Sequence, residues 1–190
     1  FAFAHLAFGD GTFLRRIRDL VVAAASMVGA AGWWVAIVKL VPASARPYIG
    51  GSQSNSILEL TFGYNGLGRL TGNEVGSVGG GGPGGGPGSG NGGSMWGETG
   101  LWRLFKSEIA GQISWLMPAA LLLGLAGLVV IGRSRRTDPR RIALWIWVSW
   151  LVVTALVFSF MSGIFHAYYT IALAPAVAAV VAIGIALLWP

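Results

Sequence analysis

The chain has 190 residues, of which 54% are hydrophobic and only 11% are charged, and it carries 9 Trp and 9 Phe. Soluble domains carry about 25% charged residues, so this composition argues against an ordinary soluble protein. The formal net charge of +6 would fit a nucleic-acid partner only if the basic residues gathered on one surface of a soluble fold. The lack of cysteine excludes disulfides and thiolate chemistry.

Four apolar stretches each have the length of a membrane span, at residues 20–41, 112–132, 142–161 and 168–189. An α-helix needs roughly 20 residues to cross a hydrocarbon core of about 30 Å. The sequence therefore predicts an all-α fold, a polytopic transmembrane helical bundle that forms one module over residues 1–190. Residues 1–8 are apolar and begin with Phe1 rather than Met. We expect them to be the end of an earlier span, with further N-terminal helices in a longer protein.

The positions of the charged residues predict the topology. The segment before the first span and the turn between the second and third spans together hold eight arginines and three aspartates, a net charge of +5 out of +6. The positive-inside rule places such short basic segments in the cytoplasm. The excess charge then sets orientation in the plasma membrane, and no nucleic-acid partner is implied. Residues 42–111 and 162–167 are predicted to lie on the extracytoplasmic side.

The long extracytoplasmic loop divides into three parts by composition. Residues 42–73 mix aromatic, apolar and turn residues and should be ordered, whereas 75–94 are almost entirely Gly and should be disordered. This tract lacks the Gly-Lys-Ser/Thr ending of a phosphate-binding loop. Apolar residues at helical spacing predict a short interfacial helix over 101–109, with Arg103 on a different face, and a second such helix at 56–64 ends at Asn65-Gly66. The apolar residues of the 101–109 helix are Leu101, Leu104, Phe105 and Ile109.

Several ordered motifs make the sequence specific. They are PASARPYIGGS at 42–52, FGYNGLGRL at 62–70, GQISWLMPAA at 111–120, FHAYYT at 165–170 and APA at 174–176. With these motifs the chain resembles the polytopic family 39 glycosyltransferases of actinobacteria and related bacteria. They are similar to the aminoarabinose transferases and protein O-mannosyltransferases of the GT-C class. The chain departs from the expected pattern at one place, because Ala167 stands where His-Pro-Tyr-Tyr would have Pro.

The resemblance implies a glycosyltransferase that moves a hexosyl or pentosyl group from a polyprenyl-phosphate carrier to an acceptor on the extracytoplasmic face. The acceptor is a lipid, a glycan or a protein. Such enzymes invert the anomeric carbon and use a carboxylate, usually an Asp of the first external loop, as the base. The three aspartates of this chain are all predicted to be cytoplasmic. No catalytic residue is therefore assigned here, and the expected base lies outside this chain.

Candidate substrate-binding residues come from the external segments. The leaving phosphate develops charge, so cationic and hydrogen-bonding groups are needed near it. Arg69 follows a turn rich in glycine, and it either binds the ligand or is a solvated loop residue. Arg103 and Lys106 are further external cations. The groups that could orient a sugar or phosphate are Tyr64, Asn65, Tyr168 and Tyr169.

His166 lies in the short external turn and has two interpretations. It is a functional group at the mouth of a helix pair, or an interfacial histidine in an aromatic belt. A metal site is not expected, because His5 is the only other histidine and lies near the opposite face; no cofactor is expected, and dependence on a divalent metal is left open. Glu59 is an acid or base by type, or a helix residue that contacts Arg69 or a neighbouring loop.

Two other classes of function compete with the transferase. A transporter or channel subunit would place ionisable groups near the middle of the membrane, where these spans have none. A non-catalytic membrane scaffold would explain the glycine tract as a tether but not the ordered motifs around it. Pro118 and Pro175 fall inside predicted spans, where proline kinks a helix.

Overall fold

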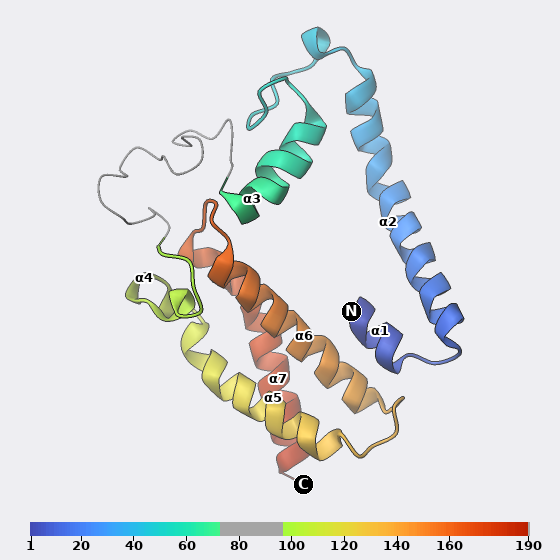
Figure 1. Cartoon of the computed structure of the whole chain (residues 1–190), viewed down its shortest axis with the longest axis vertical. Helices are drawn as coiled ribbons and strands as arrows, with labels where there is room; N and C mark the ends of the chain where they lie inside the picture. The colour runs from blue at the N-terminus through green and yellow to red at the C-terminus, as the bar shows by residue number, and fades with distance from the viewer. Residues whose placement is uncertain (73–96, 190) are drawn as a thin grey trace. The chain divides into compact units, whose positions relative to one another are not determined.

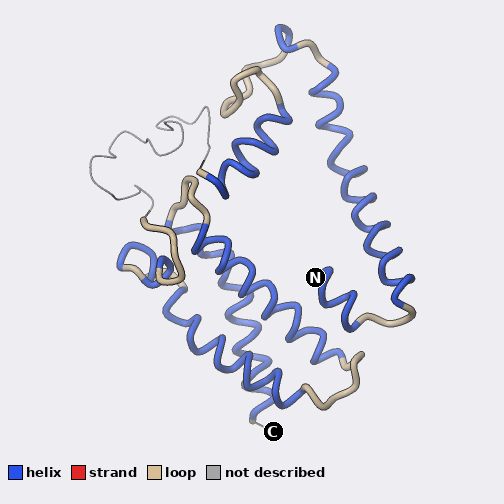
Figure 2. The backbone as a smooth tube through the Cα atoms, viewed as in Figure 1, coloured by secondary structure: helices blue, strands red, loops and turns tan. Residues whose placement is uncertain are grey.

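The computed structural model describes residues 1–72 and 97–189, and every regular element among them is helical (Figures 1 and 2). The α-helices are α1 (Ala2–Phe8), α2 (Phe13–Leu40), α3 (Gly68–Thr71), α4 (Ser107–Ala110), α5 (Met117–Ile131), α6 (Pro139–Phe160) and α7 (Ala174–Leu188). The 3-10 segments are η1 (Ala43–Ala45), η3 (Arg103–Phe105), η4 (Ser114–Leu116) and η5 (Ala167–Leu173), and η2 (Glu59–Leu67) is a π-helix. The predicted disorder of residues 75–94 falls outside the described residues.

The predicted all-α membrane fold is confirmed. Four helical stretches of the described chain are long and apolar enough to cross a membrane: Phe13–Leu40, Ser114–Ile131, Pro139–Phe160 and Ala167–Leu188. Each coincides with a predicted span. The first begins at Phe13 rather than at residue 20, because the arginine-bearing segment before the apolar run is also helical.

The chain divides into two compact units, which are described separately. Unit 1 comprises Phe1–Ala23, Leu104–Phe158 and Ala167–Pro190, and unit 2 comprises Ala24–Arg103 and Ser159–His166. The expectation of one transmembrane module over the whole chain stays a prediction.

Unit 1 is built around close contact between α5 and α7, supported by α6. A Cβ atom added at Gly124 would lie 2.9 Å from Val180 Cγ1, and one added at Gly184 would lie 2.8 Å from Leu123 Cβ. Glycine is therefore required where the helix backbones approach. Leu144 of α6 is fully buried, and its Cδ2 lies 3.1 Å from a Cβ built at Gly127. Glycines of α5 and α7 thus lie where α5 contacts α7 and α6.

The two prolines start helices rather than kink them, which corrects the prediction. Pro118 and Pro175 each lie in the first turn of an α-helix, α5 and α7 respectively, directly after the 3-10 segments η4 and η5. The first N–H groups of an α-helix have no intrahelical partner, so proline loses nothing there and its fixed φ suits the helix. The spans Ser114–Ile131 and Ala167–Leu188 each consist, consequently, of a 3-10 segment followed by an α-helix.

The short helix α1 packs on α6 through aromatic rings. Phe8 is buried and stacks on Trp145 at 5.6 Å between ring centroids, and Phe3 meets the same indole edge-on at 5.6 Å. These contacts bring the start of α2 to the end of unit 1 that carries the α5–α6 turn. The two arginine-rich segments predicted to share a membrane face therefore lie at the same end of this unit.

In unit 2, the segment after α2 is ordered by two polar side chains. Arg46 donates hydrogen bonds to the carbonyls of Lys39 (2.9 Å), Val41 (2.5 Å) and Asn55 (2.8 Å), so its guanidinium satisfies the end of α2. Asn55 has a φ of 52° and accepts a bond from the Ile49 N–H at 2.7 Å. The order predicted for residues 42–73 is present throughout the part described, and the PASARPYIGGS motif supplies its central cation.

The helix predicted to end at Asn65-Gly66 continues beyond them. Gly66 has non-helical dihedrals (φ −106°, ψ −109°), yet the chain resumes as α3 and stops at Gly72, whose φ is 80°. The glycine turn signal therefore marks a kink within the π-helix η2. Gly72 tolerates the left-handed conformation that ends the helix, which other residues adopt only at a cost.

The interfacial helix predicted over 101–109 is instead two short turns, η3 and α4. Leu104 and Ile109 are buried in the protein, whereas Leu101 is 62% exposed and Phe105 37% exposed. Arg103, expected on a polar face, is only 1% exposed. The helical spacing was overridden because tertiary contacts of the Arg103 side chain stabilise a tighter turn.

Candidate functional site

The segment Ser159–His166 links α6 to η5 and pairs with the end of α3 through main-chain hydrogen bonds. The Ser162 N–H donates to the Leu70 carbonyl at 3.1 Å, and the Gly163 N–H donates to the Arg69 carbonyl at 2.9 Å. A Cβ added at Gly72 would lie 3.2 Å from Ser162 Cβ, so this glycine also permits the approach. Two motifs almost a hundred residues apart thus meet inside unit 2.

A second segment, which follows the glycine tract, contacts the same connection. The Gly100 N–H donates to the Ser159 carbonyl at 2.7 Å, and Arg103 Nη1 donates to the Met161 carbonyl at 2.5 Å. Residues before and after the glycine tract therefore both form hydrogen bonds with the segment Ser159–His166. This arrangement fixes the connection on both sides.

Arg103 is the buried cation of this site. Its guanidinium lies 4.6 Å above the ring of Phe165, which is 3% exposed. Burial lowers the pKa of Arg103 from its ordinary value, yet a guanidinium remains charged at any physiological pH. The ring face and the carbonyl oxygen offset part of the desolvation of this charge.

Arg69 lies over an aromatic ring from its own segment. Its guanidinium carbon is 4.7 Å from the ring centroid of Tyr64, and both side chains are partly buried. The π-helix η2 makes this contact possible, because its wider turn and the kink at Gly66 bring the two residues onto one side. The glycine-rich segment therefore carries the Arg69 guanidinium stacked on the Tyr64 ring.

The other predicted binding residues are placed as follows. Asn65 is exposed beside Tyr64, and His166 is half-buried, directly after the Phe165 that carries Arg103. Tyr168 and Tyr169 begin η5 and belong to unit 1, where their rings meet edge-to-face at 4.8 Å. Unit 2 thus contains four of the six predicted residues: Tyr64, Asn65, Arg69 and His166. The two segments that carry them are joined by the main-chain hydrogen bonds described above.

Glu59 has a structural role in the loop. Its carboxylate accepts bonds from the N–H groups of Gln53 (2.9 Å) and Ser54 (3.0 Å) and from the Ser54 hydroxyl (2.8 Å). The Ser54 and Gln53 N–H groups and the Ser54 hydroxyl hold its pKa below the ordinary value. Of the two interpretations offered by the sequence, the loop contact is the one observed.

No metal centre is visible in the described part of the chain. Among residues 1–72 and 97–189, no group of three or more His, Asp or Glu side chains lies close enough to hold an ion.

The role of Arg103 was not evident from the sequence. Its spacing within 101–109 matched the polar face of an amphipathic helix, where a cation would be solvated. The available signal was its place beside the glycine tract in a loop that also holds Arg69. Only the contact with Met161 and Phe165 distinguishes it from the exposed cations.

Comparison with known proteins agrees with the membrane fold and the motifs. The chain is 33% identical to Putative mannosyltransferase YkcB of Bacillus subtilis (strain 168), in an alignment that covers 97% of the chain and 36% of that protein. It is 31% identical to Putative mannosyltransferase YycA of the same organism, over 90% of the chain and 35% of that protein. The chain thus spans about a third of the length of these relatives.

No protein-family model matches the chain, and no solved structure matches it. The two curated matches nevertheless extend over nearly every motif described above. They confirm the resemblance to glycosyltransferases that was drawn from those motifs: along almost all of its length, the chain is similar to two putative mannosyltransferases.

Proposed function

We propose that this chain is part of an integral-membrane enzyme that transfers a sugar from a polyprenyl-phosphate carrier to an acceptor on the extracytoplasmic face. In this reaction the bond between the anomeric carbon and the phosphate oxygen breaks, and a bond to an acceptor oxygen forms. The acceptor's proton passes to a base outside this chain. The names of the two relatives support a mannosyl group as the first sugar to test.

The main-chain pairing of Arg69 and Leu70 with Ser162 and Gly163 is the observation that carries the proposal. This pairing joins the segment of Arg69, whose guanidinium stacks on Tyr64, to the segment that contains His166, and both lie in unit 2. A guanidinium binds phosphate through two parallel hydrogen bonds, and aromatic rings suit the apolar faces of a sugar. We assign the carrier phosphate to Arg69, with Tyr64, Asn65 and His166 around the phosphate or its sugar. A substrate-binding role for Tyr168 and Tyr169, which belong to unit 1, stays a prediction from the sequence.

Arg69→Ala tests this assignment. The bond to Gly163 uses the main-chain carbonyl of Arg69, so the substitution removes the guanidinium and keeps the pairing. Charge-assisted hydrogen bonds contribute about 1.5–3 kcal/mol, so transfer from a lipid-linked donor should fall roughly tenfold to a hundredfold. Arg69→Lys should recover part of the rate, because a point charge lacks the planar fork.

The matched control is Lys39→Gln, which removes an exposed cation from unit 2 and should leave transfer unchanged. His166→Ala should also lower transfer if its imidazole contacts the phosphate or sugar. Wild-type rates in both Arg69→Ala and His166→Ala, in proteins that fold normally, would remove the two residues from the site.

The proposed orientation can be tested separately. Because the chain has no cysteine, single reporters at Ser54 and Ser134 are unambiguous. In intact cells, an impermeant thiol reagent should label Ser54→Cys and should label Ser134→Cys only after permeabilisation. The reverse pattern would contradict the placement of both arginine clusters in the cytoplasm.

A further inference from the structure

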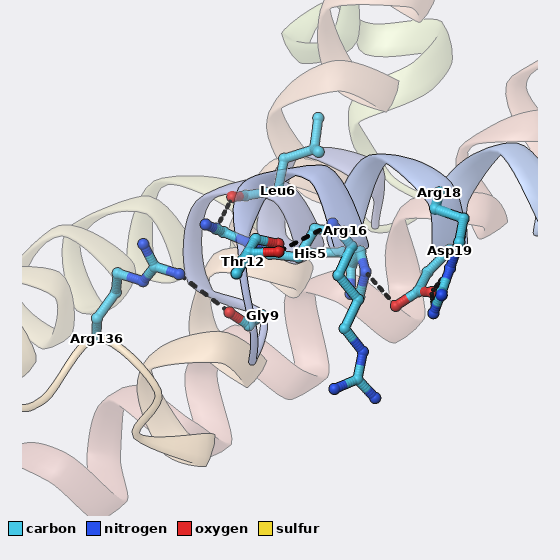
Figure 3. Close-up of polar contacts among 9 residues, drawn as sticks. His5, Leu6, Gly9, Thr12, Arg16, Arg18, Asp19 and Arg136 are labelled. Atoms are coloured by element: carbon cyan, nitrogen blue, oxygen red, sulfur yellow. Dashed lines mark hydrogen bonds and ion pairs between the residues drawn. The ribbon is translucent and has the colours of Figure 1, made fainter.

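The arginine-rich end of unit 1 is a single surface made from two distant segments. We call it the basic face; its arginines are Arg15, Arg16, Arg18, Arg133, Arg135, Arg136, Arg140 and Arg141. Arg136 Nη2 donates to the Gly9 carbonyl at 3.0 Å (Figure 3). The guanidinium of Arg141 lies 5.0 Å over the ring of Phe8. These contacts tie the α5–α6 turn to the α1–α2 connection.

Some of these arginines serve to hold the basic face in shape. Arg16 is only 5% exposed, and its Nη1 donates to the Leu6 carbonyl, with Nε at 3.5 Å from the Thr12 carbonyl (Figure 3). Arg141 Nη1 donates to the Ser134 carbonyl at 3.1 Å. The connection and the turn are thus both fixed from within.

The basic face carries more positive charge than its own carboxylates neutralise. Asp19 is paired with Arg18 at 3.1 Å, and Asp138 with Arg140 at 3.5 Å, so two of the carboxylates are locally neutralised. Among the described residues, no carboxylate forms an ion pair with Arg15, Arg133 or Arg135, and all three are exposed. A fixed surface therefore presents several unneutralised guanidinium groups.

We propose that the basic face binds the phosphate headgroups of anionic lipids. It lies where α2 begins and where α5 ends and α6 begins, which is the depth of the headgroups for helices that span a membrane. Clusters of four to eight basic residues beside a span attract anionic lipid, and this cluster holds eight. A lysine would serve equally well to set topology, but all eight are arginine, whose planar fork matches phosphate. This inference stands apart from the sugar donor, which is assigned to unit 2.

Native mass spectrometry of the detergent-purified protein tests the proposal by titration with phosphatidylglycerol or phosphatidylcholine. The wild type should bind phosphatidylglycerol in preference. The double variant Arg133→Gln/Arg135→Gln should bind it roughly tenfold to a hundredfold more weakly, and Arg133→Lys/Arg135→Lys should fall in between. Both positions are exposed, so these variants should keep the wild-type unfolding temperature.

The double variant Lys39→Gln/Lys106→Gln is the matched control, because it removes two cations outside the basic face and should keep the preference. Equal binding of the two lipids by the wild type would overturn the proposal, as would undiminished phosphatidylglycerol binding in Arg133→Gln/Arg135→Gln. Competition by millimolar inorganic phosphate that abolishes the preference would also overturn it, since the site would then be one for a small anion.

Discussion

Arg133 and Arg135 of unit 1 and Arg69 and Arg103 of unit 2 have the same chemistry and opposite surroundings. In unit 1, Arg133 and Arg135 are exposed at the end of a helical hairpin. In unit 2, Arg103 is 1% exposed against Phe165 and Arg69 is stacked on Tyr64. A net charge, or even the position of a charge along the chain, does not distinguish these cases. Burial and aromatic contact distinguish these four arginines, and both are visible only in the folded chain.

The units also differ in what holds them together. Unit 1 depends on glycines that let α5 and α7 approach, whereas unit 2 depends on polar side chains that bind main-chain carbonyls. An apolar helix pair needs close packing, because lipid offers no hydrophobic driving force between helices. A loop segment needs partners for its N–H and C=O groups, and in unit 2 Arg46 and Arg103 donate to four of the carbonyls.

Removal of a buried arginine should have the largest effect on stability. Arg103→Ala leaves the Met161 carbonyl without its charged donor, so we expect a loss of roughly 1.5–3 kcal/mol in the free energy of unfolding. Arg133→Ala, at an exposed position, should change it by less than about 0.5 kcal/mol. Thermal unfolding of the two variants in one detergent measures the difference. Equal effects would mean that burial does not separate the two classes of arginine.

Replacing glycine by alanine should destabilise unit 1 at Gly184 and should not destabilise unit 2 at Gly29. Gly184→Ala places a Cβ 2.8 Å from Leu123 Cβ and 3.0 Å from its carbonyl oxygen, so unit 1 must shift at a cost of about 1–3 kcal/mol, partly offset by the better helix propensity of Ala. Gly29→Ala, where an added Cβ meets nothing within 4 Å, should be stabilising by up to about 1 kcal/mol. Thermal unfolding again provides the measurement, and a stabilising Gly184→Ala would show that α5 and α7 are not in close contact.

The smallest effect should come from Glu59 and should depend on pH. Its folded-state pKa is lowered, so its contribution to stability is complete above the unfolded pKa and is lost as the pH falls through the folded value. The wild type should therefore unfold at a slightly higher temperature than Glu59→Gln near neutral pH, and the difference should vanish in acid. A difference that persists at low pH would mean that the charge of Glu59 is not what holds Gln53 and Ser54.

Much of unit 1 could be predicted from the sequence, and less of unit 2. The spans could be predicted from the length of the apolar runs, because a helix satisfies its own backbone hydrogen bonds in hydrocarbon and few other structures do. The shared location of the arginine clusters followed from charge counting. The burial of Arg103 could not be foreseen, since it depends on contacts with Met161 and Phe165, which are distant in sequence. Periodicity within 101–109 even pointed the wrong way for Arg103, because a local pattern contains no information about Met161 or Phe165.

The packing of α5 on α7 has an electrostatic consequence. Gly124 faces Val180 and Gly127 faces Gly184, so residue numbers rise together along the contact and the two helices run parallel. Their carbonyl ends, which carry the negative pole of each helix dipole, consequently lie at one end of the pair. That end is the one with the arginines, and Arg141 Nη1 lies 3.5 Å from the Gly132 carbonyl that follows α5. The backbone itself therefore supplies negative charge to the cluster, which lessens the mutual repulsion of its guanidinium groups before any lipid is bound.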